Sequence, residues 1–175
     1  HMALFKKKIT EQELGKIIYD NIRYEVMSQD GVLSHISLMK NLEENPNMLK
    51  PLYIIELIIG LLFGSLLSIE KKYQHPKAAE IMDSNRFGFL KHTTDTFEIS
   101  EEQLNLLIAK RFESYYECLK NQSGSGYVWH LGKQYHWNII GEEKLDNPSA
   151  PMFAGLFIFK ATELVDQIMK DYKIV

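Results

Sequence analysis

The sequence predicts a mainly α-helical protein, folded as a single-domain bundle of five or six helices with two central apolar helices. Two segments begin with the same helix-start signal and continue with apolar residues at helical spacing. Two others, residues 52–69 and 152–159, are apolar almost throughout and are expected at the centre. Only residues 127–140 have the aromatic and β-branched composition of strands. A length of 175 residues fits one domain, 1–175.

The first helix is predicted to begin in the segment KITEQEL. Thr10 fits the N-cap and Glu13 the third helical position, a capping box in which each side chain accepts a hydrogen bond from the other residue's amide. Ile9 and Leu14 stand at the two positions of a hydrophobic staple. The apolar stripe that follows has i, i+3, i+4, i+8 spacing and comprises Leu14, Ile17, Ile18, Ile22 and Val26.

The same signal returns in the segment EISEEQL. Ser100 and Gln103 take the capping-box positions, and Ile99 and Leu104 take the staple positions. The stripe behind them has the same spacing and comprises Leu104, Leu107, Ile108, Phe112 and Tyr116. A second amphipathic helix is therefore predicted here.

An internal duplication that relates residues 9–73 to residues 99–172 would explain this match. An asparagine and a proline four positions apart also precede each of the two apolar segments. Two independent helix starts are the alternative, and they are favoured because capping boxes are common.

Residues 52–69 form the most apolar segment, with Glu56 as its one charge. As a helix the segment would be about 27 Å long, just below the ~30 Å hydrocarbon core of a membrane. Gly60 and Gly64 have the spacing that lets helices approach closely. We predict a helix buried inside the protein, because the segment is short for a span and carries a carboxylate. A membrane span is the alternative interpretation.

Shorter helical patterns and breakers fill the rest of the chain. Residues 31–49 predict a helix, and another helix is predicted to begin after Pro76, which suits a first turn. The polar residues 84–96 predict an irregular connection, and NQSGSG at 121–126 is the strongest breaker. The last helix is predicted over residues 151–172.

The aromatic segment is predicted to contain a short β-hairpin near residues 127–138. Gly132, followed by a lysine, suits the first position of a type II′ turn. In this register the side chains of His130 and His136 point to opposite faces of the hairpin, so they cannot share a metal ion.

Charge and composition limit the partners. A net charge of −3 gives no basic surface for a polyanion, so no nucleic-acid partner is expected. The one basic run, residues 6–8, is interpreted as a solvated tail. Residues 1–8 as a whole are interpreted as a disordered or tag-derived start, because His1 and Met2 resemble a cloning remnant. Cys118 is the one cysteine, and with no signal peptide visible the expected location is cytoplasmic.

The sequence contains no complete catalytic or cofactor motif. The segment GYVWHLGK differs from a phosphate-binding loop in its glycine spacing, and Gln134 stands where a serine or threonine would ligate magnesium. No His-Glu-x-x-His or Glu-x-x-His pattern occurs, which argues against a zinc hydrolase and a di-iron bundle. We therefore expect no cofactor and no bound metal ion.

The first candidate site consists of the aromatic and histidine side chains of the predicted hairpin. These side chains are Tyr127, Trp129, His130, Tyr135, His136 and Trp137. The favoured interpretation is that they cover one end of the bundle. Partner binding is the next, because tryptophan and tyrosine dominate protein–protein contacts. A metal or catalytic role is the third.

Glu56 is the second candidate. A buried carboxylate without a partner would have a raised pKa and could transfer protons. The favoured alternative places Glu56 near the start of its helix, where the helix dipole stabilises negative charge and Lys160 can reach it. Cys118 lies beside an apolar stripe and is interpreted as a small hydrophobic residue.

Three functional hypotheses follow. The first is a non-enzymatic interaction protein that self-associates, for instance as a homodimer, or docks a protein partner through an apolar helix face or the aromatic hairpin. The second is a carrier or sensor of a small apolar ligand held between the central helices. The lining predicted for that ligand comprises Phe63, Phe153, Phe157 and Phe159. The third is an enzyme of unknown class that uses His130, His136 or Glu56.

Overall fold

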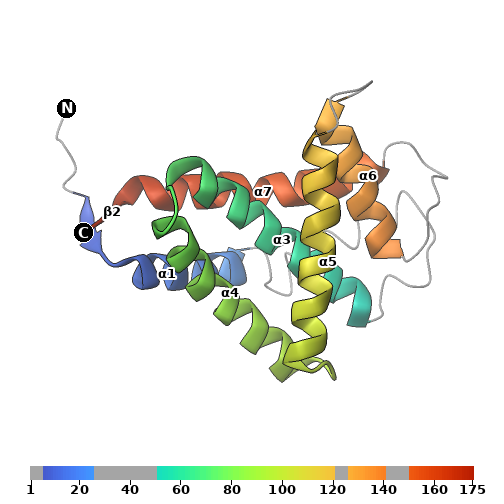
Figure 1. Ribbon diagram of the computed structural model, residues 1–175, viewed down its shortest axis with the longest axis horizontal. Coiled ribbons are helices and arrows are strands. Elements are labelled where there is room, and N and C mark those ends of the chain that lie inside the picture. Colours follow the sequence, from blue (N-terminus) through green and yellow to red (C-terminus); the bar gives the residue numbers. More distant parts are fainter. Residues whose placement is uncertain (1–5, 26–50, 121–125, 141–149) are drawn as a thin grey trace.

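The computed structural model describes residues 6–25, 51–120, 126–140 and 150–175, which form six α-helices and one two-stranded sheet (Figure 1). The elements in chain order are β1 (Lys7–Ile9), α1 (Glu11–Glu25), α3 (Pro51–Lys72), α4 (Lys77–Thr96), α5 (Glu101–Lys120), α6 (Gly126–Ile140), α7 (Ala150–Asp171) and β2 (Tyr172–Ile174). The mainly α-helical class is confirmed. The helix predicted over residues 31–49 lies outside the described residues.

Both predicted capping boxes are present. The Thr10 amide donates to the Glu13 carboxylate at 2.8 Å, and the Glu13 amide donates to the Thr10 hydroxyl at 3.2 Å. At the start of α5, Ser100 and Gln103 exchange the equivalent bonds at 3.1 and 3.2 Å. Each box satisfies amides at the first turn that would otherwise lack a partner within the helix.

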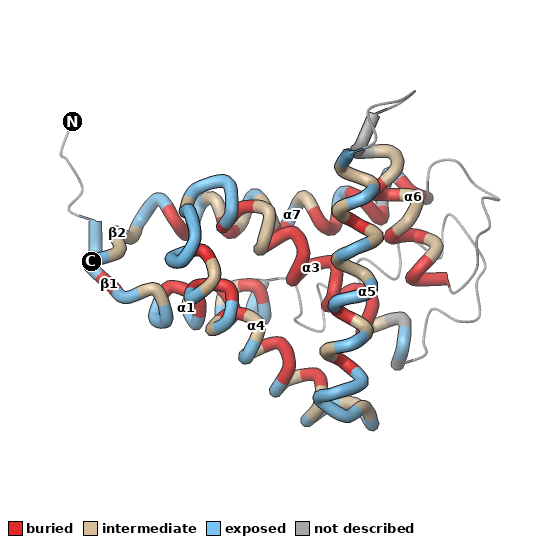
Figure 2. The backbone as a smooth tube through the Cα atoms, viewed as in Figure 1, coloured by how far each residue is buried: buried red, intermediate tan, exposed pale blue. Residues whose placement is uncertain are grey.

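The apolar helix α3 runs through the middle of the molecule (Figures 1 and 2). Every residue from position 55 to position 65 is buried, which confirms that this segment packs inside the protein. α4, α5, α6 and α7 all contact it. Among the described residues, no helix combines the length and the apolar character needed to cross a membrane.

α3 and α7 lie side by side and run parallel. A Cβ on Gly64 would collide with the Ile158 carbonyl, so glycine at this position allows the two backbones to approach. One turn further along both helices, the Ser68 hydroxyl donates to the Thr162 carbonyl at 2.9 Å. α7 itself confirms the final helix that was predicted over residues 151–172.

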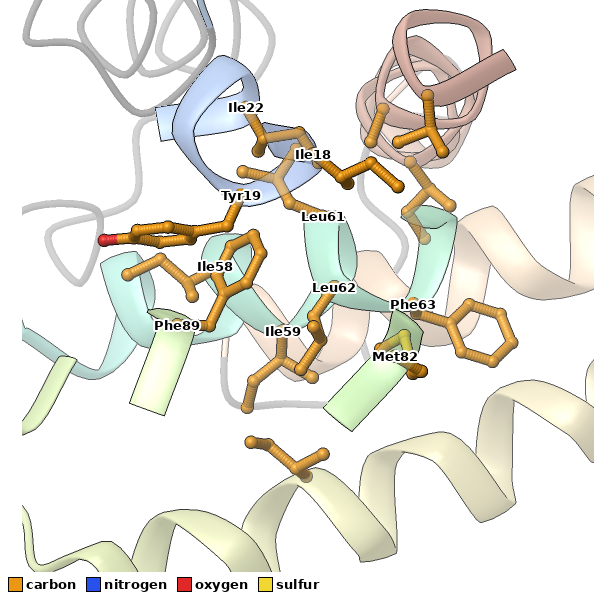
Figure 3. Packing of buried hydrophobic residues seen from close by; sticks show 14 of the residues in the cluster. Ile18, Tyr19, Ile22, Ile58, Ile59, Leu61, Leu62, Phe63, Met82 and Phe89 are labelled. Carbon is orange, nitrogen blue, oxygen red and sulfur yellow. The ribbon is translucent and has the colours of Figure 1, made fainter. Parts of the chain in front are cut away.

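α1 and α4 form a second parallel pair with the same device. A Cβ on Gly15 would collide with the Ile81 carbonyl, and the Ser84 hydroxyl donates to the Gln12 carbonyl at 2.9 Å. The two pairs meet in one core, where side chains of α1, α3 and α4 fill the space between these helices (Figure 3). Within that core the rings of Tyr19 and Phe89 meet edge to face at 5.3 Å.

The hairpin predicted near residues 127–138 is wrong, because this segment forms α6. Its buried residues Leu131, Tyr135 and Ile139 follow one another at intervals of four, which is helical spacing. Gly132 is no turn residue. It lies where a Cβ would collide with the Pro151 carbonyl, so it lets α6 pack closely against α7.

The irregular connection predicted over residues 84–96 is also wrong, because α4 continues to Thr96. Two polar residues, Asn85 and Thr93, occupy its buried face and hide the apolar stripe that would have predicted a helix. The Thr93 hydroxyl donates to the Phe89 carbonyl at 2.8 Å, so its polarity is satisfied inside the helix.

The ends of the chain pair with each other. β1 and β2 form a parallel two-stranded sheet in which Lys8 lies opposite Lys173, and Ile9 is buried. Lys7 and Lys8 therefore form part of a strand, which corrects the interpretation of residues 6–8 as a solvated tail, while residues 1–5 lie outside the described residues. A lysine run gives no signal for a strand, since its pairing partner is far away in sequence.

Candidate functional site: the groove between α1 and α4

The aromatic residues of α6 divide between the core and the surface. Tyr135 and His136 are fully buried, and the Tyr135 hydroxyl donates to the Leu57 carbonyl of α3 at 3.3 Å. Trp129, His130 and Trp137 are half-buried, whereas the side chain of Tyr127 lies outside the described residues. The predicted contact surface on this segment therefore rests on its three half-buried members.

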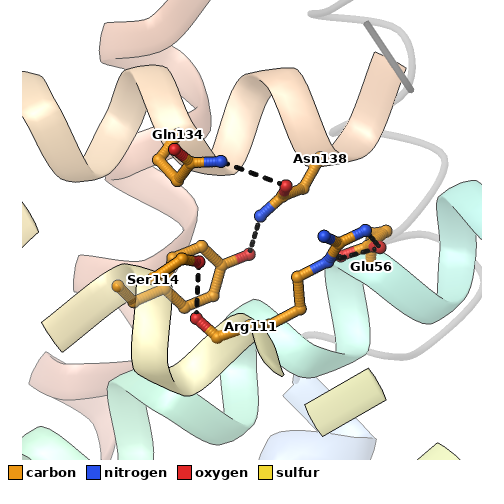
Figure 4. A network of polar contacts seen from close by, with 6 residues as sticks. Glu56, Arg111, Ser114, Gln134 and Asn138 are labelled. Atoms are coloured by element: carbon orange, nitrogen blue, oxygen red, sulfur yellow. Dashed lines mark hydrogen bonds and ion pairs between the residues drawn. The ribbon is translucent and has the colours of Figure 1, made fainter. Parts of the chain in front are cut away.

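Glu56 is fully buried and forms an ion pair with Arg111 of α5 (Figure 4). The Arg111 Nε donates to both carboxylate oxygens at 2.9 and 3.1 Å, and its Nη2 donates to one of them at 2.6 Å. The partner predicted for Glu56 was Lys160, which is instead exposed on α7. Burial raises the pKa of the Glu56 carboxyl, and the Arg111 hydrogen bonds lower it in part.

A second polar contact lies beside this ion pair. The Asn138 side-chain amide donates to the Tyr115 hydroxyl at 3.1 Å, and Gln134 donates to the Asn138 carbonyl oxygen at 3.3 Å (Figure 4). Burial, and secondarily the Glu56 charge, raises the pKa of Tyr115, so its phenol stays protonated. These polar groups of α3, α5 and α6 satisfy one another, which specifies how the three helices meet.

The four phenylalanines predicted to line a ligand pocket differ from one another in burial and surroundings. The ring of Phe63 is surrounded by Phe112, Tyr115 and Tyr116, with centroid distances of 5.2, 5.1 and 5.3 Å. Phe157 is buried, Phe159 is half-buried, and the side chain of Phe153 lies outside the described residues. The apolar-ligand hypothesis stays a prediction.

A groove of about 750 Å³ runs along the outer side of the α1–α4 pair. It is lined by Gln12, Glu13, Lys16, Tyr19, Asp20 and Arg23 of α1 and by Ser84, Phe87, Gly88, Lys91, His92, Asp95 and Thr96 of α4. We call it the α1–α4 groove.

The apolar part of the α1–α4 groove is aromatic. The Tyr19 ring packs where a Cβ on Gly88 would lie, so α4 approaches the ring closely. Burial raises the pKa of Tyr19, and Arg23 partly offsets this. Phe87, also on the groove, is 68% exposed although it is a large apolar side chain.

Charged residues follow one another along the α1–α4 groove. Near the start of α1 lies Glu13, and in the middle Lys16 and Asp20 form an ion pair at 2.5 Å. The far end is formed by Arg23 and Lys91 together with Asp95 and His92. Burial lowers the pKa of His92, so the imidazole is neutral at neutral pH. The groove is thus acidic at one end, neutral in the middle and basic at the other end.

A smaller pocket of about 440 Å³ lies where α3 turns into α4, between Glu70, Tyr73, His75 and Met82. Glu70 accepts a hydrogen bond from the Tyr116 hydroxyl at 2.8 Å. In the parts of the chain that the structure describes, no three histidine, cysteine or acidic side chains converge as a metal site would require.

The sequence did not predict the α1–α4 groove, because half of its lining comes from the residues interpreted as an irregular connection. Continuing the four-residue spacing from Ile81 through Asn85 and Phe89 would have extended the helix and placed Phe87 on its outer face. Comparisons of the chain with models of protein families, with curated proteins and with solved structures give no match.

Proposed function

We propose that this chain is a self-associating interaction protein, and that two copies meet through their α1–α4 grooves. The observation that carries the proposal is the exposed Phe87 on the groove. A phenylalanine with most of its surface in water forgoes about 1.5–3 kcal/mol that burial would give. A phenylalanine beside an open groove can recover that free energy if each copy inserts its ring into the groove of the other.

The order of charges along the groove suits a second copy of the same chain. A two-fold axis across the groove makes the two copies run in opposite directions, so the same surface must complement itself. The Glu13 end of one groove then meets the end of the other that holds Arg23 and Lys91. The paired Lys16 and Asp20 in the middle present no net charge. Such matching favours the antiparallel arrangement over others.

Tyr24 extends the proposed contact beyond the groove. It is 78% exposed, and it lies one helical turn from Asp20, so both side chains are on the same face of α1. Tyrosine is among the residues enriched in interface hot spots. The same proposal retains the expected cytoplasmic location, which suits a chain whose single cysteine can form no intramolecular disulfide.

The test is the Phe87→Asp variant, compared with Leu106→Asp as a matched control. Leu106 is 67% exposed on α5 and does not line the groove, so the two substitutions place the same charge at equally exposed apolar sites. Sedimentation velocity over a range of concentrations should give a dimer for the native chain and for Leu106→Asp, and a monomer for Phe87→Asp.

Three results would overturn this proposal. One is a native chain that sediments as a monomer up to high micromolar concentration. Another is a dimer that Phe87→Asp leaves intact while circular dichroism shows both variants folded. A dimer lost equally in both variants would place the contact elsewhere and would also reject the groove as its site.

A further inference from the structure

A concentration of lysines marks the end of the molecule where the two chain termini meet, at the left of Figure 1. It is formed by β1 and β2 and by the C-terminal ends of α3 and α7. We call it the basic pole, and its lysines are Lys6, Lys7, Lys8, Lys71, Lys72, Lys170 and Lys173. The chain as a whole carries a net charge of −3, so this surface contrasts with the rest of the protein.

Three observations show that these lysines lie close to one another. Lys8 lies opposite Lys173 in the sheet. The Lys72 ammonium donates a hydrogen bond to the Met169 carbonyl, next to Lys170. β1, which follows Lys6, pairs with β2 directly after α7, so the N-terminal run lies at the same end of the molecule. Burial and, after it, the positive charge of Lys6 lower the pKa of Lys72, and Asp166 partly offsets this.

Acidic residues do not neutralise the basic pole. Among the described residues, Lys71 is its one member with an ion pair, to Asp166 at 3.7 Å. Asp166 also accepts a hydrogen bond from Ser68, and Glu70 accepts one from Tyr116. Asp171 is the remaining acidic side chain in the last turn of α7.

The helix dipole explains why some lysines of the basic pole lie where they do, but it does not explain the lysines of the strands. Lys71, Lys72 and Lys170 lie in the last turns of α3 and α7, where a positive charge is favourable because of the helix dipole. The lysines of β1 and β2 gain no such stabilisation from a helix dipole. Lys8 directly opposite Lys173 is a like-charge pair, which destabilises a sheet. An anionic partner would relieve that repulsion.

Among the described residues, no strand pairs with the outer edge of β1. The Val175 amide donates to the Ile9 carbonyl at 3.2 Å, so the polar backbone groups of Ile9 face β2. In a parallel ladder, successive residues direct their amide and carbonyl to alternate sides, and the backbone of Lys8 therefore faces outward. The side chains of Lys7 and Lys8 are both exposed.

We propose that the basic pole binds an extended acidic segment of a partner protein, which adds to the outer edge of β1 as a third strand. The open edge supplies backbone hydrogen bonds, and the lysines supply the charge preference. Lys8 and Lys173 lie on the same face of the sheet, so acidic residues at alternate positions of the added strand face them. A membrane surface or a nucleic acid would use the charge and leave the open edge unused.

The first experiment uses the full chain and a fluorescein-labelled peptide in which glutamate alternates with valine. A second peptide of equal charge has its central valine replaced by proline, which cannot donate in a ladder. We expect the alternating peptide to raise fluorescence anisotropy with an affinity at least about tenfold above that of the proline peptide, and to lose affinity with added salt. Hydrogen exchange of β1 should slow when the alternating peptide binds.

The second experiment tests the lysines without disturbing the fold. Lys8→Glu replaces a repelling pair with an attracting one, so this variant should be at least as stable as the native chain while binding the peptide about tenfold more weakly. Lys110→Glu, at an exposed site on α5, is the matched control and should bind like the native chain.

Several results would overturn the inference. Equal affinity for the two peptides would show that charge alone acts and that no strand is added. Stronger binding to phosphatidylserine vesicles or to a DNA duplex than to the alternating peptide would assign the pole to those partners instead. An unchanged affinity in Lys8→Glu would remove the strand lysines from the site. None of these readouts depends on whether the α1–α4 groove dimerises.

Discussion

Two pairs of parallel helices in this molecule are held by one device, a glycine that faces a carbonyl of the neighbouring helix: Gly64 and Ile158 in α3–α7, and Gly15 and Ile81 in α1–α4. Their surroundings differ. In the first pair α3 is enclosed, because α4, α5, α6 and α7 all contact it and every residue from position 55 to position 65 is buried. The α1–α4 pair faces the core on one side and opens as a groove on the other.

This difference between a buried and an open helix pair indicates which part of the molecule can bind a partner. Close backbone packing is common to both pairs, so it does not by itself provide a binding surface. Around α3, the buried Glu56 carboxylate is paired with Arg111. In the open region, Phe87 and the charged side chains beside it line an open groove, and Phe87 is largely exposed to solvent. The contrast agrees with our proposal that the region around α3 stabilises the fold and that α1–α4 provides the contact surface.

The largest expected effect is at the buried ion pair. Arg111→Met leaves the Glu56 carboxylate buried without its cation, and we expect a loss of about 3–5 kcal/mol in the free energy of unfolding. The double variant Glu56→Met with Arg111→Met should recover most of that loss, because it leaves no charge behind. Urea unfolding followed by circular dichroism measures both.

An exposed ion pair with the same shortest distance provides the control. Lys120 and Glu117 approach to 2.6 Å on the surface of α5, and Lys120→Met should cost less than about 1 kcal/mol. If Arg111→Met cost no more than this control, the enclosed region would not depend on its polar contact, and the contrast drawn above would fail.

The next effect compares the two glycines directly. Gly64→Ala places a methyl group against the Ile158 carbonyl inside an enclosed pair, and we expect a cost of about 2–3 kcal/mol. Gly15→Ala meets the Ile81 carbonyl in the same way, but α1 can move toward solvent, so about 1 kcal/mol is expected. Both changes oppose the gain of about 1 kcal/mol that alanine normally brings to a helix.

Thermal and urea unfolding of these two variants sharpen the comparison. Equal losses in the free energy of unfolding would mean that the α1–α4 pair is held as rigidly as α3–α7. The open side of α1–α4 would then not allow α1 to move toward solvent. A larger cost for Gly15→Ala would reverse the assignment of the two regions.

Local signals in the sequence were sufficient for the features that depend on near neighbours. The capping boxes at Thr10 and Ser100 follow from residues three positions apart, and both are formed. The burial of α3 follows from a run of apolar side chains that has to be covered. The last helix follows from its spacing. In each case one segment contains the whole cause.

Features that depend on distant residues could not be predicted. Arg111 reaches Glu56 from 55 positions away, and Lys8 meets Lys173 only after the chain has folded. α6 was misjudged because aromatic content was given more importance than the four-residue spacing of Leu131 and Tyr135. The α1–α4 groove was missed because Asn85 brings polarity to a buried face, and local polarity then resembles a loop.

The smallest expected effect tests whether the two matching helix starts contribute equally in the two regions. Thr10→Ala and Ser100→Ala each remove a hydroxyl that accepts a bond at 3.2 Å, and each should cost about 1 kcal/mol. Thr96→Ala is the control, because its hydroxyl bonds a carbonyl within α4 and caps no amide, so its cost should stay within about 0.5 kcal/mol. The start of α1 follows β1 directly, whereas α5 has no strand before it among the described residues. A Thr10→Ala cost well below that of Ser100→Ala would therefore mean that strand pairing, more than capping, orders the first turn of α1.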